Sequence, residues 1–397
     1  MFYLFLLFLI MRPFLDLFED YKVFGLNIAS TYTIFLIVIS IINISLNYKF
    51  FQRKKCFKSS MFLSFLIFFI ILVPSIFISN YMMSTYTSIL KYLTLIVFSI
   101  MFCFYADEPD KRIKMIKAIL ISFVISVIYG LIQFATGNAM YDLQVGGYRI
   151  HSVFVHPNSY AFYLIAIISI LLFIDKKQVF NDHYILYYIL LLSGFAMLAL
   201  TYCRSAWIWL LFILIGYFMS SNLNKKLVLF LVFIGVILLT FNFIQDRFVD
   251  VVDSTYEGRS SLDARENIWS NMLSLVKTPN LFGFGLGTFV DYNLLYFNSD
   301  LPAHNEYVHY YFESGILGVS GLIIFFLILI VSSFKIRGKE KYRYIFLVVG
   351  LIVCSYSSNI FSMLVSQIYF VAIFTIIQPI YIGRDIEYNS ECYISRT

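Results

Sequence analysis

The amino-acid sequence predicts an all-α protein that crosses a membrane many times, and three observations lead to this class. Hydrophobic residues make up 60% of the 397 residues and charged residues only 13%. With a mean hydropathy of +0.83, this composition excludes a soluble globular protein. Apolar runs of about 20 residues recur along the chain, long enough for a helix to cross the hydrocarbon core, and they lack the alternation of a β-barrel.

The apolar runs predict about twelve transmembrane helices in a single membrane domain that covers residues 1–397. They lie near residues 1–11, 26–47, 60–79, 86–105, 118–136, 158–174, 184–201, 206–221, 227–244, 314–334, 344–358 and 361–383.

The basic residues predict which connecting segments face the cytoplasm. Short segments carry 20 of the 29 lysines and arginines, and the positive-inside rule places them and both termini on that side. These segments are 49–58, 107–117, 175–183, 222–226, 335–343 and the C-terminal end. The net charge of +6 therefore reflects topology, and we expect no nucleic-acid partner.

The same rule places residues 245–303, the longest polar stretch, outside the cytoplasm as one large loop. Acidic residues outnumber basic ones there, so its arginines do not form a general basic patch. Arg265 and Trp269 share one face of a predicted amphipathic helix. The glycines at 283, 285 and 287 follow no strand and precede no Lys-Ser/Thr, so we interpret them as an irregular turn and not as a phosphate-binding loop.

Two polar residues at predicted membrane boundaries have both a structural and a functional interpretation. Arg204 lies between two apolar runs that are joined by almost no loop. Its side chain either snorkels to the lipid head groups or acts as a functional cation. The positive-inside rule favours the second interpretation, because it disfavours an arginine without a role on the outer side. His304 is either a polar helix terminus or a base, since a helix dipole keeps a neutral imidazole at its start. His309 and Glu313 are spaced to pair, and Gly315, Gly318 and Gly321 indicate helix packing.

These residues carry a resemblance to a known family. His304-Asn305, nine residues, Gly315, two residues and Gly318 resemble the signature of the O-antigen ligase and polymerase superfamily. The junction at Arg204 and the segment with Arg265, Trp269 and the three glycines are similar to further parts of that family, as is His156-Pro157-Asn158. The supporting pattern extends from residue 149 to residue 321.

The resemblance implies a glycosyltransferase at the outer face of the bacterial cytoplasmic membrane, using an undecaprenyl-diphosphate-linked glycan without nucleotide sugar, metal or other cofactor. An acceptor hydroxyl benefits from a base, and a departing diphosphate from the bidentate fork of arginine. We therefore expect His304, Arg204 and Arg265 to be catalytic. The expected substrate-binding residues are Asn305, Arg259, Trp269, Glu313, Arg149, His156 and Asn158.

Three functions remain open at this point. We favour a polymerase that joins lipid-linked repeat units, with a flippase and a chain-length regulator as cellular partners. The first alternative is a ligase that passes the finished glycan to lipid A core or to protein. The second is a flippase for the same lipid-linked unit, which the nearly charge-free spans disfavour.

Overall fold

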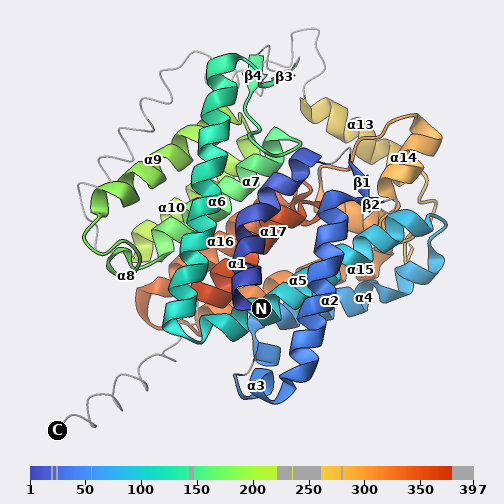
Figure 1. Cartoon of the computed structure of the whole chain (residues 1–397). Coiled ribbons are helices and arrows are strands. Elements are labelled where there is room, and N and C mark those ends of the chain that lie inside the picture. Colours follow the sequence, from blue (N-terminus) through green and yellow to red (C-terminus); the bar gives the residue numbers. More distant parts are fainter. Residues whose placement is uncertain are drawn as a thin grey trace.

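A computed structural model describes residues 1–18, 21–23, 26–54, 56–142, 147–220, 235, 261–278 and 280–377, and Figure 1 shows their arrangement as a bundle of helices. The predicted span 227–244, Arg259, and the last part of the predicted span 361–383 lie outside these residues, except for Gly235.

The predicted all-α class is confirmed, and helices occupy the predicted apolar runs of the described chain. Within these residues, five helices are long and apolar enough to cross a membrane: α2 (Ile28–Leu46), α4 (Ser60–Ile78), α5 (Met82–Ala106), α6 (Pro109–Thr136) and α15 (Glu306–Phe334). Shorter apolar helices are α7 (Pro157–Phe173), α9 (Tyr184–Leu200), α10 (Arg204–Ser220) and α17 (Leu364–Ala372), which continues as the π-helical turn η5 (Ile373–Ile377). Two more helices lie at predicted spans, α1 (Phe2–Met11) and α16 (Lys341–Cys354). The number of twelve spans stays a prediction.

The remaining elements are short connections. They are η1 (Arg12–Phe18), the hairpin of β1 (Lys22–Val23) and β2 (Leu26–Asn27), α3 (Tyr48–Arg53), η2 (Cys56–Lys58), the hairpin of β3 (Met140–Asp142) and β4 (Gly147–Arg149), α8 (Lys176–Phe180), η3 (Gly338–Glu340) and η4 (Ile360–Ser362). Two further helices, α13 (Ser261–Ser274) and α14 (Phe289–Phe297), lie within the predicted loop 245–303.

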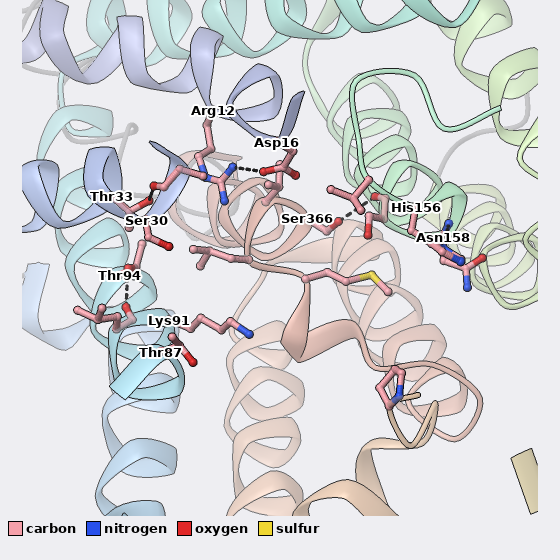
Figure 2. A pocket seen from close by; sticks show the side chains of 18 of the residues that line it. Arg12, Asp16, Ser30, Thr33, Thr87, Lys91, Thr94, His156, Asn158 and Ser366 are labelled. Carbon is pink, nitrogen blue, oxygen red and sulfur yellow. Dashed lines mark hydrogen bonds and ion pairs between the residues drawn. The ribbon is translucent and has the colours of Figure 1, made fainter. Parts of the chain in front are cut away.

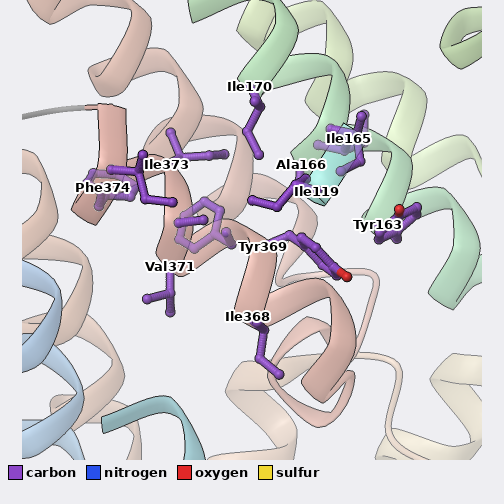
Figure 3. Packing of buried hydrophobic residues seen from close by; sticks show 14 of the residues in the cluster. Ile119, Tyr163, Ile165, Ala166, Ile170, Ile368, Tyr369, Val371, Ile373 and Phe374 are labelled. Atoms are coloured by element: carbon purple, nitrogen blue, oxygen red, sulfur yellow. The ribbon is translucent and has the colours of Figure 1, made fainter. Parts of the chain in front are cut away.

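Helix α7 is the centre of the bundle, because nearly all of its residues are buried. It packs against α9, α10 and α17. Figure 3 shows apolar side chains of α7 and of the α17–η5 segment interdigitating. The rings of Tyr163 and Tyr369 meet edge to face with centroids 4.9 Å apart, and the hydroxyl of Tyr369 donates to the carbonyl of Leu9 at 2.6 Å. This packing fixes the position of the first turn of α7, which contributes to the candidate site.

Segments that the charge rule assigns to one side of the membrane meet in two places in the fold. Lys54 forms ion pairs with Asp107 at 3.5 Å and Glu108 at 3.3 Å, which joins the segments 49–58 and 107–117. At the C-terminal end of α7, Arg343 lies over the ring of Phe173 and donates to the Ser220 hydroxyl at 2.7 Å. These contacts agree with the charge rule, because they join segments predicted to lie on the same side of the membrane. Which side faces the cytoplasm stays a prediction.

Labelling of single cysteines in whole cells tests this orientation. In a chain whose five cysteines have been replaced, we expect an impermeant thiol reagent to label Thr278→Cys and not Lys339→Cys, because both positions are exposed and the charge rule puts them on opposite sides. Lysis should make position 339 reactive, which controls for access. Labelling of position 339 alone in intact cells would invert the topology.

Candidate active site

The site is built around a break in helix α15. At Gly315 the backbone has φ 62° and ψ −151°, so the helix stops and restarts. Loop 280–287 fills the break with four hydrogen bonds. Phe284 and Gly285 donate to the carbonyls of Phe312 and Glu313, both at 2.9 Å, while Ile316 and Leu317 donate to the carbonyls of Asn280 and Leu281 at 3.0 and 3.2 Å. Backbone groups inside a membrane protein need such partners, because hydrocarbon offers none.

Glycine is required on both sides of this contact. A Cβ atom on Gly315 would lie 2.3 Å from the carbonyl oxygen of Asn280, and one on Gly283 would lie 2.3 Å from the backbone of Glu313. Gly283, Gly285 and Gly287 all have positive φ, which confirms the predicted irregular turn. The prediction that Gly315 serves helix packing is wrong, because it forms the break; Gly321 does pack, against Phe68.

Glu313 locks the loop onto α15. Its buried carboxylate accepts from the backbone amides of Gly287 at 2.7 Å and Phe289 at 3.0 Å, and the predicted pair with His309 forms at 3.3 Å. Both carboxylate oxygens are therefore used by the fold. This geometry does not support the prediction that Glu313 binds substrate.

His304 is held between two anchored residues. Trp269 donates from its indole to the carbonyl of Ala303 at 2.5 Å, and Asn305 caps α15 by accepting from the amides of Tyr307 at 2.9 Å and Val308 at 3.1 Å. His304 itself has φ 50°, an uncommon value outside glycine that tends to occur at functional sites. Asn305 and Trp269 thus bond to the backbone on either side of His304, and the prediction that they bind substrate stays a prediction.

The surroundings of His304 keep its imidazole neutral. Burial, followed by the charges of Arg265 and His156, lowers the pKa of His304 to about 4 from its ordinary value of 6.5. The predicted neutral imidazole is therefore supported, but its cause differs from the expected helix dipole. Three of the predicted site residues, His304, Arg265 and His156, thus lie close enough for their charges to interact.

One turn, residues 355–358, contacts the three segments that carry His304 and the two candidate arginines. Arg265 donates to the carbonyl of Ser357 at 2.9 Å. Ser205, the neighbour of Arg204 at the start of α10, shares a hydrogen bond of 2.8 Å with Ser358. The amide of Glu306, two residues after His304, donates to the carbonyl of Ser355 at 2.7 Å. Arg204, Arg265 and His304 thus come from three distant segments that meet at this turn.

The buried Arg149 connects a second group of predicted residues to the same place. It donates to the carbonyl of Thr201 at 2.9 Å and to the side chain of Asn158 at 2.7 Å. His156 caps α7 by accepting at Nδ1 from the amide of Asn158 at 3.0 Å. Arg149 therefore ties the start of α7 to the junction that precedes Arg204.

A cavity of about 500 Å³ opens beside His304, and His156 and Asn158 also line it. Neither Arg204 nor Arg265 is among its lining residues. The polar residues around it that sequence reasoning did not assign include Arg12, Asp16, Ser30, Thr33, Thr87, Lys91, Thr94 and Ser366, most of them labelled in Figure 2. A signal for Lys91 was present in the sequence, since it is an ionisable residue inside a predicted span.

The fold and this site define a multi-pass membrane protein with a polar centre beside a broken helix. A family model described as O-antigen ligase matches residues 188–323. This match includes the motif at His304 and supports the predicted resemblance to the O-antigen polymerase and ligase superfamily. No curated protein matches the chain.

The matched segment contains Arg204, Arg265, Trp269, His304 and the broken part of α15, whereas Arg149, His156, Asn158 and Lys91 precede it. The family connects the chain to surface polysaccharide assembly by membrane glycosyltransferase-like enzymes that act on lipid-linked glycans.

The break in α15 can be tested with two alanine substitutions. Gly137→Ala and Gly315→Ala both place a side chain at positive φ, but only Gly315 faces neighbouring atoms, since nothing lies within 4 Å of a Cβ on Gly137. We expect Gly137→Ala to cost about 1 kcal/mol of stability and Gly315→Ala clearly more, measured as the thermal unfolding midpoint in detergent. Equal shifts for the two variants would contradict the role of the break.

The arginines can be tested with lysine substitutions. Lysine keeps the charge but loses the bidentate fork, so we expect Arg204→Lys and Arg265→Lys to lower glycan transfer by about tenfold to a hundredfold, measured with purified protein. Arg343→Lys, near the other end of α7, is the matched control and should retain its activity. Transfer near the wild-type rate in either site variant would show that charge alone explains that arginine.

Proposed function

We propose that the chain is a polysaccharide polymerase that joins undecaprenyl-diphosphate-linked repeat units at the outer face of the bacterial cytoplasmic membrane. The observation that carries this proposal is His304, a half-buried imidazole with a lowered pKa that lines a cavity, lies within electrostatic reach of Arg265, and opens the family motif. A flippase and a chain-length regulator are its proposed partners in the cell.

In the proposed reaction, the acceptor hydroxyl attacks the anomeric carbon of the donor glycan. His304 takes the hydroxyl proton, a new C–O bond forms, and the bond from the anomeric carbon to the diphosphate oxygen breaks. That oxygen keeps the electron pair, and the lipid diphosphate leaves as an anion. Arg265 and Arg204 stabilise its added charge, the part that a metal ion plays in other phosphate sites, so that no metal is required.

The family description itself favours a second function, a ligase that passes a finished glycan from the lipid carrier to lipid A core or protein. The two functions differ in the product of a deletion strain. Loss of a polymerase leaves single repeat units on the final acceptor, whereas loss of a ligase leaves long glycan unattached. Unattached long glycan in the deletion strain would replace our proposal with the ligase.

A purified protein separates both enzymes from a transporter. In detergent there is no second compartment, so a flippase produces no chemical change. We expect the purified protein to lengthen a lipid-linked oligosaccharide. Failure to do so, with the deletion strain also lacking long glycan, would favour the flippase.

The base role of His304 predicts a specific pH profile. His304 is neutral above its folded pKa of about 4 and protonated below it, so kcat/KM should fall on the acid side near that pH. Arg265→Gln removes a positive neighbour, which should raise the pKa of His304 and move this acid limb toward neutral pH. The quantity to measure is the pH at the midpoint of the acid limb, and not the maximal value of kcat/KM.

His304→Gln supplies the control for this profile. Glutamine restores a hydrogen bond but accepts no proton at these pH values, so the variant should be slower by about a hundredfold to ten-thousandfold and lack the acid limb. A wild-type rate with an unchanged limb would leave His304 as a positioning residue.

A further inference from the structure

Lys91 is a positive charge inside a membrane-spanning helix. It lies within α5, one of the helices long and apolar enough to cross a membrane. The residue lines the same cavity as His304. Figure 2 shows its ammonium pointing from α5 into this cavity, on the side away from His156 and Asn158. Thr87 and Thr94 lie on the same face of α5 and also line the cavity.

No anion is bonded to this ammonium within the described part of the chain. Glu306 and Glu313 act on Lys91 only through space. Glu313 is bonded to the amides of Gly287 and Phe289, and Glu306 accepts from the amide of Phe361 at 2.6 Å.

The other cavity cation on the N-terminal elements is already compensated. Arg12 forms an ion pair with Asp16 at 2.7 Å, and both side chains line the cavity. An ammonium at membrane depth is costly unless an anion accompanies it, and such residues mark sites for charged ligands. Among the described residues that line the cavity, Lys91 is thus a cation to which no anion is bonded.

We propose that Lys91 binds the diphosphate of the lipid-linked donor glycan. This inference rests on the proposed glycosyl transfer and adds a binding residue from a part of the chain that precedes the matched family segment. A lysine ammonium offers three donors on a compact charge, which suits phosphate oxygens. When the bond to the anomeric carbon breaks, the diphosphate gains one negative charge, and Lys91 stabilises that charge inside the cavity.

The depth of Lys91 favours a lipid-borne anion over a soluble one. It lies nine residues beyond Met82, the first residue of α5, which is about 14 Å along the helix axis. Burial of its isoprenoid chain keeps a lipid-linked diphosphate at the membrane, next to this cavity. Inorganic diphosphate pays the same cost of leaving water but has no such anchor.

Binding of tritiated undecaprenyl diphosphate to the purified full-length protein tests the proposal. We expect Lys91→Gln to weaken binding by about tenfold to a hundredfold, and Lys91→Arg to stay within a few-fold of wild type because it keeps the charge. Lys277→Gln is the matched control, since Lys277 is exposed on the predicted outer side, and it should bind like wild type. Elution volume and unfolding midpoint establish that each variant is folded.

The outcomes separate this proposal from the proposed function. Normal elongation by the wild type together with unweakened binding by Lys91→Gln would overturn the role of Lys91 and leave the polymerase standing. If the folded Lys91→Arg variant bound undecaprenyl diphosphate as weakly as Lys91→Gln does, the argument from charge would be overturned. Competition by inorganic diphosphate at the concentration of the lipid would overturn the lipid-borne ligand. Charge-dependent binding without any elongation would retain Lys91 and remove the polymerase.

Discussion

The need to satisfy backbone hydrogen bonds at the break in α15 determines the architecture of this site. A helix interrupted in an apolar environment leaves amides and carbonyls without partners, which is tolerated only when protein supplies them. Here loop 280–287 supplies four bonds, and Glu313 adds one bond to this loop and one to Phe289, the first residue of α14. The loop and the broken helix therefore have to fold as one piece. The conformation of the chain between them, with His304 near its end, depends on that union.

The second organising feature is the turn at residues 355–358, which has no charged residue of its own. It binds Arg265 through a carbonyl, the start of α10 through a hydroxyl, and the start of α15 through another carbonyl. Neutral oxygens of this kind orient a guanidinium without cancelling its charge. The positive field near His304 is thereby preserved, and burial of the imidazole strengthens its effect.

The helix positions could be predicted from the sequence because apolar runs directly reflect burial in a membrane. Both α7 and α9, for example, begin and end within a residue or two of their predicted bounds. The predicted span 314–334 covers only the second part of α15, because the polar first turns of this helix resemble a loop in a hydropathy pattern, whereas the helix start predicted at His304 lies two residues from the observed Glu306. Gly315 was mistaken for a packing residue because its partner, Asn280, is distant in sequence.

The candidate site was predictable where a family motif marked it and less so elsewhere. His304, Arg265 and His156 do come together. The roles of Asn305, Trp269 and Glu313 in positioning the fold depend on contacts that no local pattern reveals. Lys91 carried a signal in the sequence, since it is an ionisable residue inside a predicted span, but no motif connected it with the other site residues. Segment 261–303 also shares a small apolar core with α15, formed by Ile268, Met272, Phe289, Tyr292, Ala303 and Phe312. Ile268 and Met272 belong to α13, the helix that carries Arg265, and Ala303 adjoins His304, so the same packing that orders this core also sets the spacing between the cation and the base.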